Sequence, residues 1–579
     1  MAATIENLSP VDAFTSGVYP DVESGGETAK FIGEISNPAW VDGGDNLGRH
    51  ALVYTEPEDR TFEAIKNIGE TLAEEARAKG MEVTVEEDFA GNVYITLIGE
   101  DPDAKKILIE SHGDSVPRGG RVDGVYGIAS GLTLVKKFID EGRRPAKSLI
   151  VAAFRGEESS RTKFGCLGSA LATGSVTIER LKKIKNESSG KSIFHELRER
   201  FCHKNGQILS DDQFEVILQK ELGMRADFLR KIAYAIEVHP EQADILQTLD
   251  KSMAAVTAIG AAERYDLIFS GDIFEQFSPE MYVSAEGPVE RVKLKIIGQA
   301  DHSGAAPMNG EKFGDKTYFR RDALVETARI FAEIMAQPVE GLAVTGISVP
   351  GGGVNTVSGV CELEIVLPRS IREKVLRDIE NKMNGWVGLK AEIVEENIQR
   401  NLQGIRDEVL RKVFNLIVTV NYQATDFAVR SGGKVRATMG NIQVKEDKII
   451  VSVDQRKTNE DWHSQLRPAL HRVFEEFHSQ GVNLTETEPN CGEIANCNEA
   501  MIGFADKVYK VLYGEKMENR DSMPGHDLAK FILKGVPSIL FFVRSYNGSH
   551  NPNEAVRVDD VREMDKFLEA FVEELMSAA

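Results

Sequence analysis

The chain has 579 residues, which is longer than chains that fold around a single hydrophobic core usually are, so we expect at least two domains. Its 69 Lys and Arg residues against 91 Asp and Glu residues give a net charge of -22, which repels a phosphate backbone and argues against nucleic acid as a partner. The five cysteines form no CxxC pair and the apolar runs are too short to cross a membrane, so we predict a cytoplasmic protein without a disulfide framework.

The first predicted domain alternates helices with apolar strands. Residues 1–50 are rich in Gly, Ser, Asp and Glu, and we predict an irregular arm there. A helical spacing of apolar residues over 61–80 is followed by the strands MEVTVEED, NVYITLIG and KKILIES, the helix ASGLTLVKKFIDEG and the strand KSLIVAAF. Residues 175–230 form a charged excursion, before a last helix, DLAKFILKG, and strand, VPSILFFV. This order predicts an α/β catalytic domain with a mostly parallel sheet, made of residues 1–289 and 489–579.

Residues 290–488 have a different pattern and are predicted to form an inserted α+β lid domain. They contain alternating strands such as RVKLKIIG and CELEIVL, with amphipathic helices between them. Residues 292–396 give strand, helix, two strands, helix and strand. Residues 404–488 give a second, shorter pass in a similar order. We therefore expect this domain to be internally duplicated.

Side chains that suit metal binding follow the buried strands of the first domain. Open α/β sheets bind ligands at the carboxyl ends of their strands, so we expect these side chains to converge. Imidazole and carboxylate groups suit Zn²⁺ when no thiolate is offered, and a carboxylate, unlike an imidazole, can bridge two ions. The candidates are His112, Asp114, Asp123, Glu157, Glu158 and His550.

Each candidate has an expected role. Asp123 is the natural bridge between two ions, and Asp114 can accept the second N–H of the His112 ring and so fix its orientation. Adjacent Glu157 and Glu158 point to opposite sides of an extended backbone, so one can bind metal while the other serves as general base. A single histidine or a Glu-Glu pair is more often structural, but candidates at several strand ends favour function.

Six motifs in one order resemble a known enzyme family. They are SHGDSVPRGGRVDGVYGIASGL, FRGEESSRTKFGCLGS, ADHSGAAPM followed by RRDALVETARI, GGGVNTVSG, PGHD and SHNPNE. Together they resemble the zinc amidohydrolases that include N-carbamoyl-L-amino acid hydrolases, β-ureidopropionases and allantoate amidohydrolases. They are more distantly similar to aminoacylases and related metallopeptidases. The joint occurrence of the motifs is highly specific.

The resemblance implies a set of site residues. Two zinc ions, or manganese or cobalt in their place, would be held by His112, Asp123, Glu158, His239 and His550, with Asp123 shared between them. Glu157 would be the general base that activates water, and His302 would stabilise the negative charge that develops on the substrate. Gln242, Asn355 and His526 would contact the substrate.

The lid domain departs from the family at one motif. The aspartate-x-arginine that clamps the substrate carboxylate is replaced by Leu367-Pro368-Arg369, whereas Asp454-Gln455-Arg456 restores it in the second pass. Dimeric relatives pair their lid domains by edge strands, and two copies in one chain could make this pairing internally. We therefore predict a monomer in which Arg456 outranks Arg369. The alternative is a homodimer in which residues 404–488 are an added extension.

The resemblance implies hydrolysis of the C–N bond of an N-carbamoyl or other N-substituted amino acid, a small molecule that carries a carboxylate. An aminoacylase or a dipeptidase of the same superfamily is the close alternative, because the metal chemistry is shared and only the pocket differs. A non-catalytic binding module on the same fold is a third hypothesis. It is disfavoured because Glu157 has no structural reason to persist in such a module.

Overall fold

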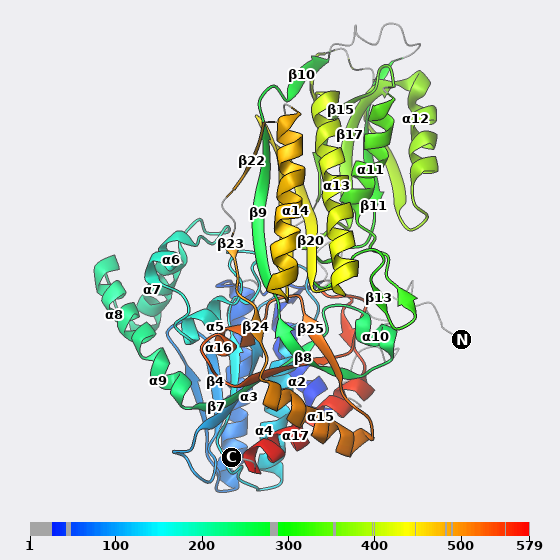
Figure 1. Ribbon diagram of the computed structural model, residues 1–579. Coiled ribbons are helices and arrows are strands. Elements are labelled where there is room, and N and C mark those ends of the chain that lie inside the picture. The colour runs from blue at the N-terminus through cyan, green and yellow to red at the C-terminus, as the bar shows by residue number, and fades with distance from the viewer. Residues whose placement is uncertain are drawn as a thin grey trace. The chain divides into compact units, whose positions relative to one another are not determined.

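The structure, a computed structural model, separates the chain into two units (Figure 1). Unit 1 is Met1–Ile259 with Ala495–Ala579, and unit 2 is Gly260–Ile494. The sequence places the boundaries of the inserted domain at 290 and 488 instead. Unit 2 begins earlier because the strand β9 (Ala261–Ser270) pairs with a late strand of the same unit, β21 (Lys448–Lys457). The structure describes residues 26–41, 48–51, 53–277, 288–337, 339–350, 355–396, 398, 400–445, 447–480, 483–487, 490–550 and 552–577.

Unit 1 is built on a mixed sheet. The strand order is β24 (Ala495–Asn496), β8 (Met253–Ile259), β26 (Ser538–Val543), β7 (Ile232–Pro240), β5 (Lys106–His112), β6 (Leu149–Phe154), β4 (Val93–Leu97) and β3 (Val83–Glu87), and β25 (Glu518–Ser522) pairs with β8. The strands β26, β7, β5 and β6 run parallel, whereas β3, β4, β8 and β24 add antiparallel pairs at both sides. The prediction of a mostly parallel sheet therefore holds only for the centre, where the strands are apolar and buried on both faces.

Helices cover both faces of this sheet. One face carries α2 (Gly26–Ser36), α3 (Glu56–Ala78), α4 (Val125–Asp140), α15 (Glu499–Tyr513) and α17 (Val558–Ser577). The other face carries α5 (Leu167–Ala172), α9 (Arg225–Arg230) and α16 (Leu528–Ile532). The charged excursion forms α6 (Ile178–Lys183), α7 (Ile193–Asn205) and α8 (Asp211–Gly223), which pack together with α5, and α10 (Ile245–Leu249) follows β7.

Helix α2 corrects the expectation of an irregular arm at the N-terminal end. Phe31, Ile32 and Ile35 are spaced so that they share one face of the helix, and all three are buried in the core of unit 1. The helix is short, and the polar residues on both sides of it hide its period in the sequence. Residues 1–25 and 42–47 of the predicted arm lie outside the described residues.

Unit 2 is a two-layer α+β structure with an antiparallel sheet. The strand order is β18 (Gly388–Glu395), β11 (Val289–Ile297), β17 (Val360–Pro368), β15 (Ala343–Ser348), β20 (Val435–Lys445), β21, β9 and β22 (Asn483–Glu486), and β23 (Asn490–Cys491) also pairs with β9. The helices α11 (Ala323–Ala336), α12 (Arg369–Lys382), α13 (Asp407–Ser431) and α14 (Glu460–Ser479) pack on one face, along which α13 and α14 are seen in Figure 1. The other face carries ion pairs such as Lys295–Glu362, at 2.7 Å.

The strands of unit 2 fall into two sets with the same order of elements. The first set is β11, α11, β15, β17, α12 and β18, and its strands lie side by side as β18-β11-β17-β15. The second set is β9, α13, β20, β21, α14 and β22, and its strands lie as β22-β9-β21-β20. The two sets meet where β15 pairs with β20. The sequence-based halves omit β9, which precedes the whole first set in the chain although it belongs to the second.

Short elements complete the description. They are the 3₁₀ helix η1 (Asn37–Ala39) and the strand pairs β1 (Trp40–Val41) with β2 (Gly48–Arg49), β10 (Phe274–Phe277) with β19 (Leu402–Ile405), β12 (Asp301–His302) with β16 (Thr356–Val357), β13 (Lys312–Phe313) with β14 (Lys316–Thr317), and β27 (Ser545–Tyr546) with β28 (Ala555–Val556). Within the described part of the chain, no helix has the length and apolar composition needed to span a bilayer.

Candidate active site

The five predicted metal ligands lie at one edge of the sheet in unit 1. His112 is the last residue of β5, and His239 is the next to last residue of its parallel neighbour β7. Glu158 follows β6, Asp123 precedes α4, and His550 follows β26 and the short strand β27. The carboxyl ends of the parallel strands meet at this edge, so the fold brings together side chains that are far apart in the sequence.

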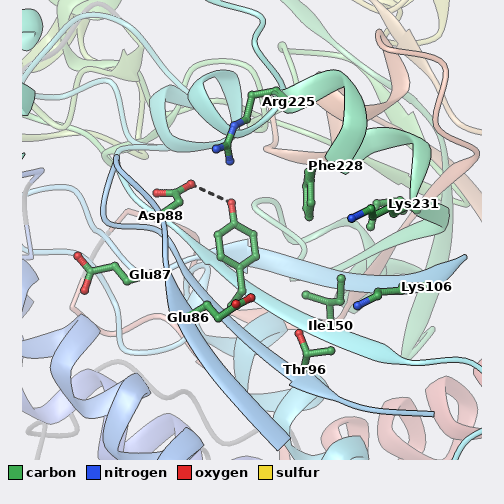
Figure 2. Close-up of a pocket in the computed structure, with 11 residues that line it drawn as sticks. Glu86, Glu87, Asp88, Thr96, Lys106, Ile150, Arg225, Phe228 and Lys231 are labelled. Atoms are coloured by element: carbon green, nitrogen blue, oxygen red, sulfur yellow. Dashed lines mark hydrogen bonds between the residues drawn. The ribbon is translucent and has the colours of Figure 1, made fainter. Parts of the chain in front are cut away.

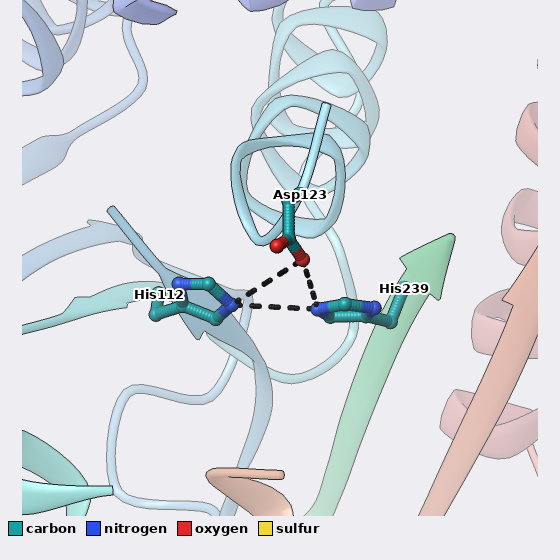
Figure 3. Close-up of side chains that lie close together, drawn as sticks. All are labelled: His112, Asp123 and His239. Atoms are coloured by element: carbon teal, nitrogen blue, oxygen red, sulfur yellow. Dashed lines mark hydrogen bonds and ion pairs between the residues drawn. The ribbon is translucent and has the colours of Figure 1, made fainter. Parts of the chain in front are cut away.

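The first group of ligands is His112, Asp123 and His239 (Figure 3). The two Nε2 atoms are 3.4 Å apart, and His239 Nε2 lies 3.3 Å from Asp123 Oδ1. His112 Nε2 lies 3.9 Å from the same oxygen. Gly124, with φ of +68°, permits this approach, because a Cβ there would lie 2.4 Å from His112 Cε1.

The second group is Asp123, Glu158 and His550. His550 Nε2 lies 3.8 Å from Asp123 Oδ2 and 3.5 Å from Glu158 Oε1. Asp123 therefore turns one carboxylate oxygen toward each group, which is the arrangement expected of a bridge. His550 has a φ of +60°, a backbone conformation that costs energy for a residue other than glycine and that recurs at functional sites.

The burial and bonding of Asp123 fit a divalent cation at each group. Both carboxylate oxygens are buried, and neither accepts a hydrogen bond from the described residues. Burial by itself would raise the pKa of Asp123, but His239, His550, His112 and Arg49 hold it below its usual range. A buried carboxylate in this state requires cations nearby. The nitrogen and oxygen donors match those that Zn²⁺, Mn²⁺ and Co²⁺ accept.

The His239 ring turns its Nε2 atom toward the other members of the first group. Its Nδ1 lies 2.8 Å from Pro240 O, a contact in which Nδ1–H donates and Nε2 is left with a lone pair. Burial and the neighbouring His526 lower the pKa of His239 to about 4, so the ring is neutral near pH 7. The Nε2 lone pair therefore points to the side where Asp123 and His112 lie.

Asp114 connects the first group to the Glu157-Glu158 loop. Its Oδ1 accepts a hydrogen bond from Glu157 N at 3.1 Å, and its Oδ2 accepts one from Glu158 N at 3.0 Å. Asp114 Oδ1 also lies 3.6 Å from His112 Nδ1. One buried carboxylate thus holds both the His112 ring and the loop that carries two further candidates, which is more than the ring-orienting role expected from the sequence.

Glu157 is half-buried beside these ligands, and its environment suits a group that exchanges protons. Burial raises the pKa of Glu157, although His112 and His526 act in the opposite direction. Cys166 Sγ lies 3.4 Å from Glu157 Oε1, and Cys166 N donates to Glu157 O at 2.9 Å. The sequence does not predict this contact, since nothing in the FGCLGS run distinguishes Cys166 from an ordinary buried thiol.

His526 and Gln242, two predicted substrate contacts, are buried in unit 1. The ring of His526 packs edge-on against His239 with centroids 4.7 Å apart, and its Nδ1 lies 3.7 Å from Glu237 Oε1. Glu237 was not a sequence-based candidate, but it stands two residues before His239 on the same face of β7, and that alternation is a usable signal. Gln242 Oε1 is buried without a hydrogen bond from the described residues.

Glu237, His239 and His526 also satisfy the spacing of a third metal group. This group shares His239 with the first group, and the Nδ1 atom of His239 is already taken up by Pro240 O. A single imidazole nitrogen binds one ion, so the third group competes with the first. The contact between Glu237 and His526 is better explained as one that orients the His526 ring.

Three of the four predicted residues of the lid domain, His302, Asn355 and Arg456, form a cluster within unit 2. His302 and Asn355 are adjacent, because β12 pairs with β16 and Ser303 N donates to Asn355 O at 2.9 Å. Gly304 separates His302 from Arg456, since a Cβ on Gly304 would lie 3.2 Å from both His302 Cε1 and Arg456 Cγ. His302 and Arg456 are both buried.

Arg369 is not part of this cluster. Its side chain is 45% exposed and is paired with Glu290 and, at 2.8 Å, with Glu396. Arg456, by contrast, is 3% exposed, and its Nε donates to Asp454 at 2.9 Å. The structure therefore brings Arg456, and not Arg369, beside His302.

A pocket of about 340 Å³ lies elsewhere in unit 1, against β4, β5 and α9 (Figure 2). Tyr94 and Phe228 form part of its wall, and Tyr94 Oη donates to Asp88 Oδ2 at 3.0 Å. Its charged lining residues are Glu86, Glu87, Asp88, Lys106, Arg225 and Lys231. None of the predicted site residues lines this pocket, and its balanced charges select no class of ligand.

The family model for peptidase family M20/M25/M40 matches residues 108–574. The chain belongs to this family. The match covers the strands that carry the metal groups in unit 1 and all of unit 2, and it confirms the resemblance predicted from the motifs.

Curated relatives are similar over part of their length. The N-carbamoyl-L-amino acid amidohydrolase of Geobacillus stearothermophilus is 26% identical over 353 residues, which are 58% of this chain and 71% of the relative. The ureidoglycolate hydrolase of Arabidopsis thaliana is 24% identical over 314 residues, 52% of this chain and 56% of the relative. An uncharacterized hydrolase of Haemophilus influenzae is 25% identical over 318 residues, 54% of this chain and 62% of the relative. The chain thus spans less than two thirds of the length of the latter two.

Solved structures share the fold. The crystal structure of AtUAH in complex with (S)-hydroxyglycine superposes with a TM-score of 0.57 at 16% identity, covering 95% of this chain and 97% of that one. At this level of identity the similarity concerns the fold alone.

Proposed function

We propose that this chain is a metal-dependent hydrolase that cleaves the C–N bond of an N-carbamoyl or N-acyl amino acid. The observation that carries the proposal is the position of Asp123, whose two buried carboxylate oxygens face two groups of ligands beside the carboxylate Glu157. The relatives named N-carbamoyl-L-amino acid amidohydrolase support the substrate class. An aminoacylase or dipeptidase would use the same ligands, so the acyl group is decided by experiment.

The proposed ligands are His112, Asp123 and His239 for one ion, and Asp123, Glu158 and His550 for the other. Ions held there would lower the pKa of a water molecule and polarise the substrate carbonyl. Every other step falls to side chains of the protein.

Glu157 accepts the proton of the attacking water at its carboxylate and returns it to the leaving nitrogen. Its raised pKa suits both transfers, because a group that accepts and then donates a proton works best near the operating pH. Asp114 holds the backbone of Glu157 through the hydrogen bond to its N–H and so keeps the base beside His112. His526, oriented by Glu237, and Gln242 offer polar contacts to the substrate.

We further propose that unit 2 acts as an internally duplicated lid. The equal order of elements in its two sets, and their junction at β15 and β20, support this reading. In the proposed scheme His302 stabilises the developing negative charge, Asn355 contacts the substrate and Arg456 clamps its carboxylate with a planar pair of donors. An internal pairing of this kind makes a monomer the expected catalytic unit, and sedimentation of the active protein at low concentration tests it.

The substrate and the metal can be tested together. Purified protein is loaded with Zn²⁺, Mn²⁺ or Co²⁺ and assayed on matched N-carbamoyl, N-acetyl and dipeptide forms of the same amino acids. We expect close to two ions per chain by elemental analysis, activity that chelation abolishes, and preference for the N-carbamoyl forms. A single bound ion with full activity would refute the bridge at Asp123, and preference for dipeptides would select the alternative function.

A further inference from the structure

Arg49 is fully buried beside the candidate metal centre, and neither the sequence-based roles nor the proposed chemistry uses it. It ends the short strand β2, whose backbone lies against the loop that joins β5 to α4. Arg49 N donates to Gly119 O at 2.7 Å, and Gly119 N donates to Arg49 O at 3.0 Å. The main chain of Arg49 is therefore fixed to the middle of that loop.

The side chain of Arg49 holds both ends of the same loop. Its Nη1 donates to Gly113 O at 3.4 Å, directly after His112, and its Nη2 donates to the backbone oxygen of Asp123. One guanidinium thus joins the residue that follows one metal ligand to the backbone of another. Residues 113–124 contain no helix or regular strand of their own, and the clamp bridges the two ends of this segment.

The residue before Arg49 is adapted to this close contact. Gly48 has a φ of +124°, which side-chain-bearing residues rarely adopt, and a Cβ there would lie 2.8 Å from the backbone of Arg118. Only glycine lets β2 come near enough to the loop for Arg49 to reach both of its ends.

The charge and shape of the guanidinium both matter at this position. Burial lowers the pKa of Arg49, while Asp123, Asp114, Glu554 and Glu158 act to raise it, and arginine stays protonated under such conditions. Its planar N–H groups point in fixed directions toward two carbonyl oxygens. The single ammonium of lysine cannot reproduce that geometry.

We propose that Arg49 is a positioning residue for the metal centre. By joining Gly113 to Asp123, it sets the spacing of His112 and Asp123 and hence the affinity for the ion that these residues share with His239. The inference rests on the proposed function, since it concerns the metal of the same site. Groups that orient metal ligands from behind typically change metal affinity by about 10–100-fold when they are mutated.

Arg49→Lys keeps the charge and removes the planar pair of donors. Zn²⁺ affinity is measured by competition with a chromophoric chelator, and thermal unfolding is followed with and without Zn²⁺. We expect Zn²⁺ to bind roughly 10–100-fold more weakly and to raise the Tm by less than in the wild type. A purely structural role would lower the Tm equally with and without metal. Arg436→Lys is the matched control, because Arg436 is a buried arginine in unit 2 that donates to the carbonyls of Gly304 and Ala305, and we expect wild-type Zn²⁺ affinity from it.

The outcomes separate this inference from the proposed function. A wild-type protein that binds no Zn²⁺ would refute the proposed function, whereas equal affinity in the wild type and Arg49→Lys would overturn the role of Arg49 alone. Arg49→Gln, which keeps one donor and loses the charge, is the second variant in case Arg49→Lys does not fold. If neither variant yields metal-free protein that unfolds cooperatively, Arg49 serves folding and the proposal is wrong.

Discussion

Two buried carboxylates of unit 2 differ from two of unit 1 in their hydrogen bonds. In unit 2, Asp454 accepts hydrogen bonds from Ser303, Arg264 and Arg456. Glu311 of the same unit pairs with Arg436 at 2.8 Å. In unit 1, the carboxylate oxygens of Asp123 and Glu110 are buried without a hydrogen bond from the described residues.

The difference separates carboxylates that neighbouring side chains compensate from a carboxylate that lies at the candidate metal groups. A buried carboxylate costs several kcal/mol unless a cation, a proton or hydrogen-bond donors compensate it. The donors around Asp454 and Glu311 provide that compensation inside unit 2, so these residues need no ligand. In unit 1, Asp123 belongs to both candidate metal groups, whereas burial together with Glu237 and Asp527 raises the pKa of Glu110 well above its usual range, so that a proton compensates Glu110. Asp123, which is buried with a lowered pKa and accepts no hydrogen bond from the described residues, therefore points to the candidate site.

The largest expected effect comes from one substitution on each side of this comparison. Glu157→Gln should keep the bound metal and lower kcat by about 10²–10⁴-fold or more, because the same carboxyl group would serve as base and then as acid. Glu311→Gln should lower the free energy of unfolding by about 3 kcal/mol, since it leaves the buried guanidinium of Arg436 without its carboxylate. Steady-state kinetics measure kcat, elemental analysis measures the bound metal, and denaturant unfolding measures the free energy of unfolding. Turnover retained in Glu157→Gln would move the base to another residue.

A smaller effect distinguishes the two arginines of unit 2. Arg456→Ala should raise KM by roughly 10–100-fold, the loss expected for a hydrogen-bonded charge pair with a substrate carboxylate. Arg369→Ala is the matched variant at the corresponding position of the first set, and it should change KM by less than about twofold because Arg369 is committed to Glu290 and Glu396. A rise in KM confined to Arg369→Ala would contradict the duplicated-lid proposal.

The last prediction concerns Asp565, another buried acid of unit 1 that keeps its proton. Burial raises the pKa of Asp565 in α17 to about 7, and Thr28 of α2 donates to it at 2.8 Å. The pKa of an unfolded aspartate is about 3.9, so this group contributes stability below about pH 4 that is lost as the pH rises through 7. Asp565→Asn removes this titration and should make the protein about 4 kcal/mol more stable than wild type at pH 8.5, with little difference at pH 4, because the two pKa values differ by about 3 units. Denaturant unfolding at both pH values checks it, and parallel pH profiles would contradict it.

The positions of the candidate metal ligands in the fold could be predicted from the sequence because chemistry and fold coincide locally there. His112, Glu158 and His550 each stand at or just beyond the end of a buried apolar strand, and strand ends are where such sheets bind ligands. Arg49 could not be found this way. It belongs to a strand of two residues. Its side chain donates to the backbone oxygens of Gly113 and Asp123, and every residue has such an oxygen, so the sequence does not indicate these partners.

The same distinction applies to the fold. The central parallel strands are continuous apolar runs and are easily predicted, whereas the antiparallel strands at the sides resemble them in composition, so the sequence does not reveal their direction. The strand β9 alternates buried and half-buried residues as clearly as any strand in unit 2. Its partner β21 is separated from it by the entire first set, and such a non-local pairing is invisible in a local pattern.

Along the chain, the first set of strands lies between β9 and the rest of the second set. This arrangement affects when each set can form during synthesis. The first set runs from β11 to β18 without interruption, so every strand that it needs has left the ribosome once β18 is complete. The strand β9 emerges before all of them. Its neighbours in the sheet emerge much later, because β21 follows α13 and β22 follows α14. Pairing the strands of the second set thus spans a much longer stretch of chain than pairing those of the first set. Until β21 has been synthesised, β9 is a strand whose edges lack their partners in the sheet.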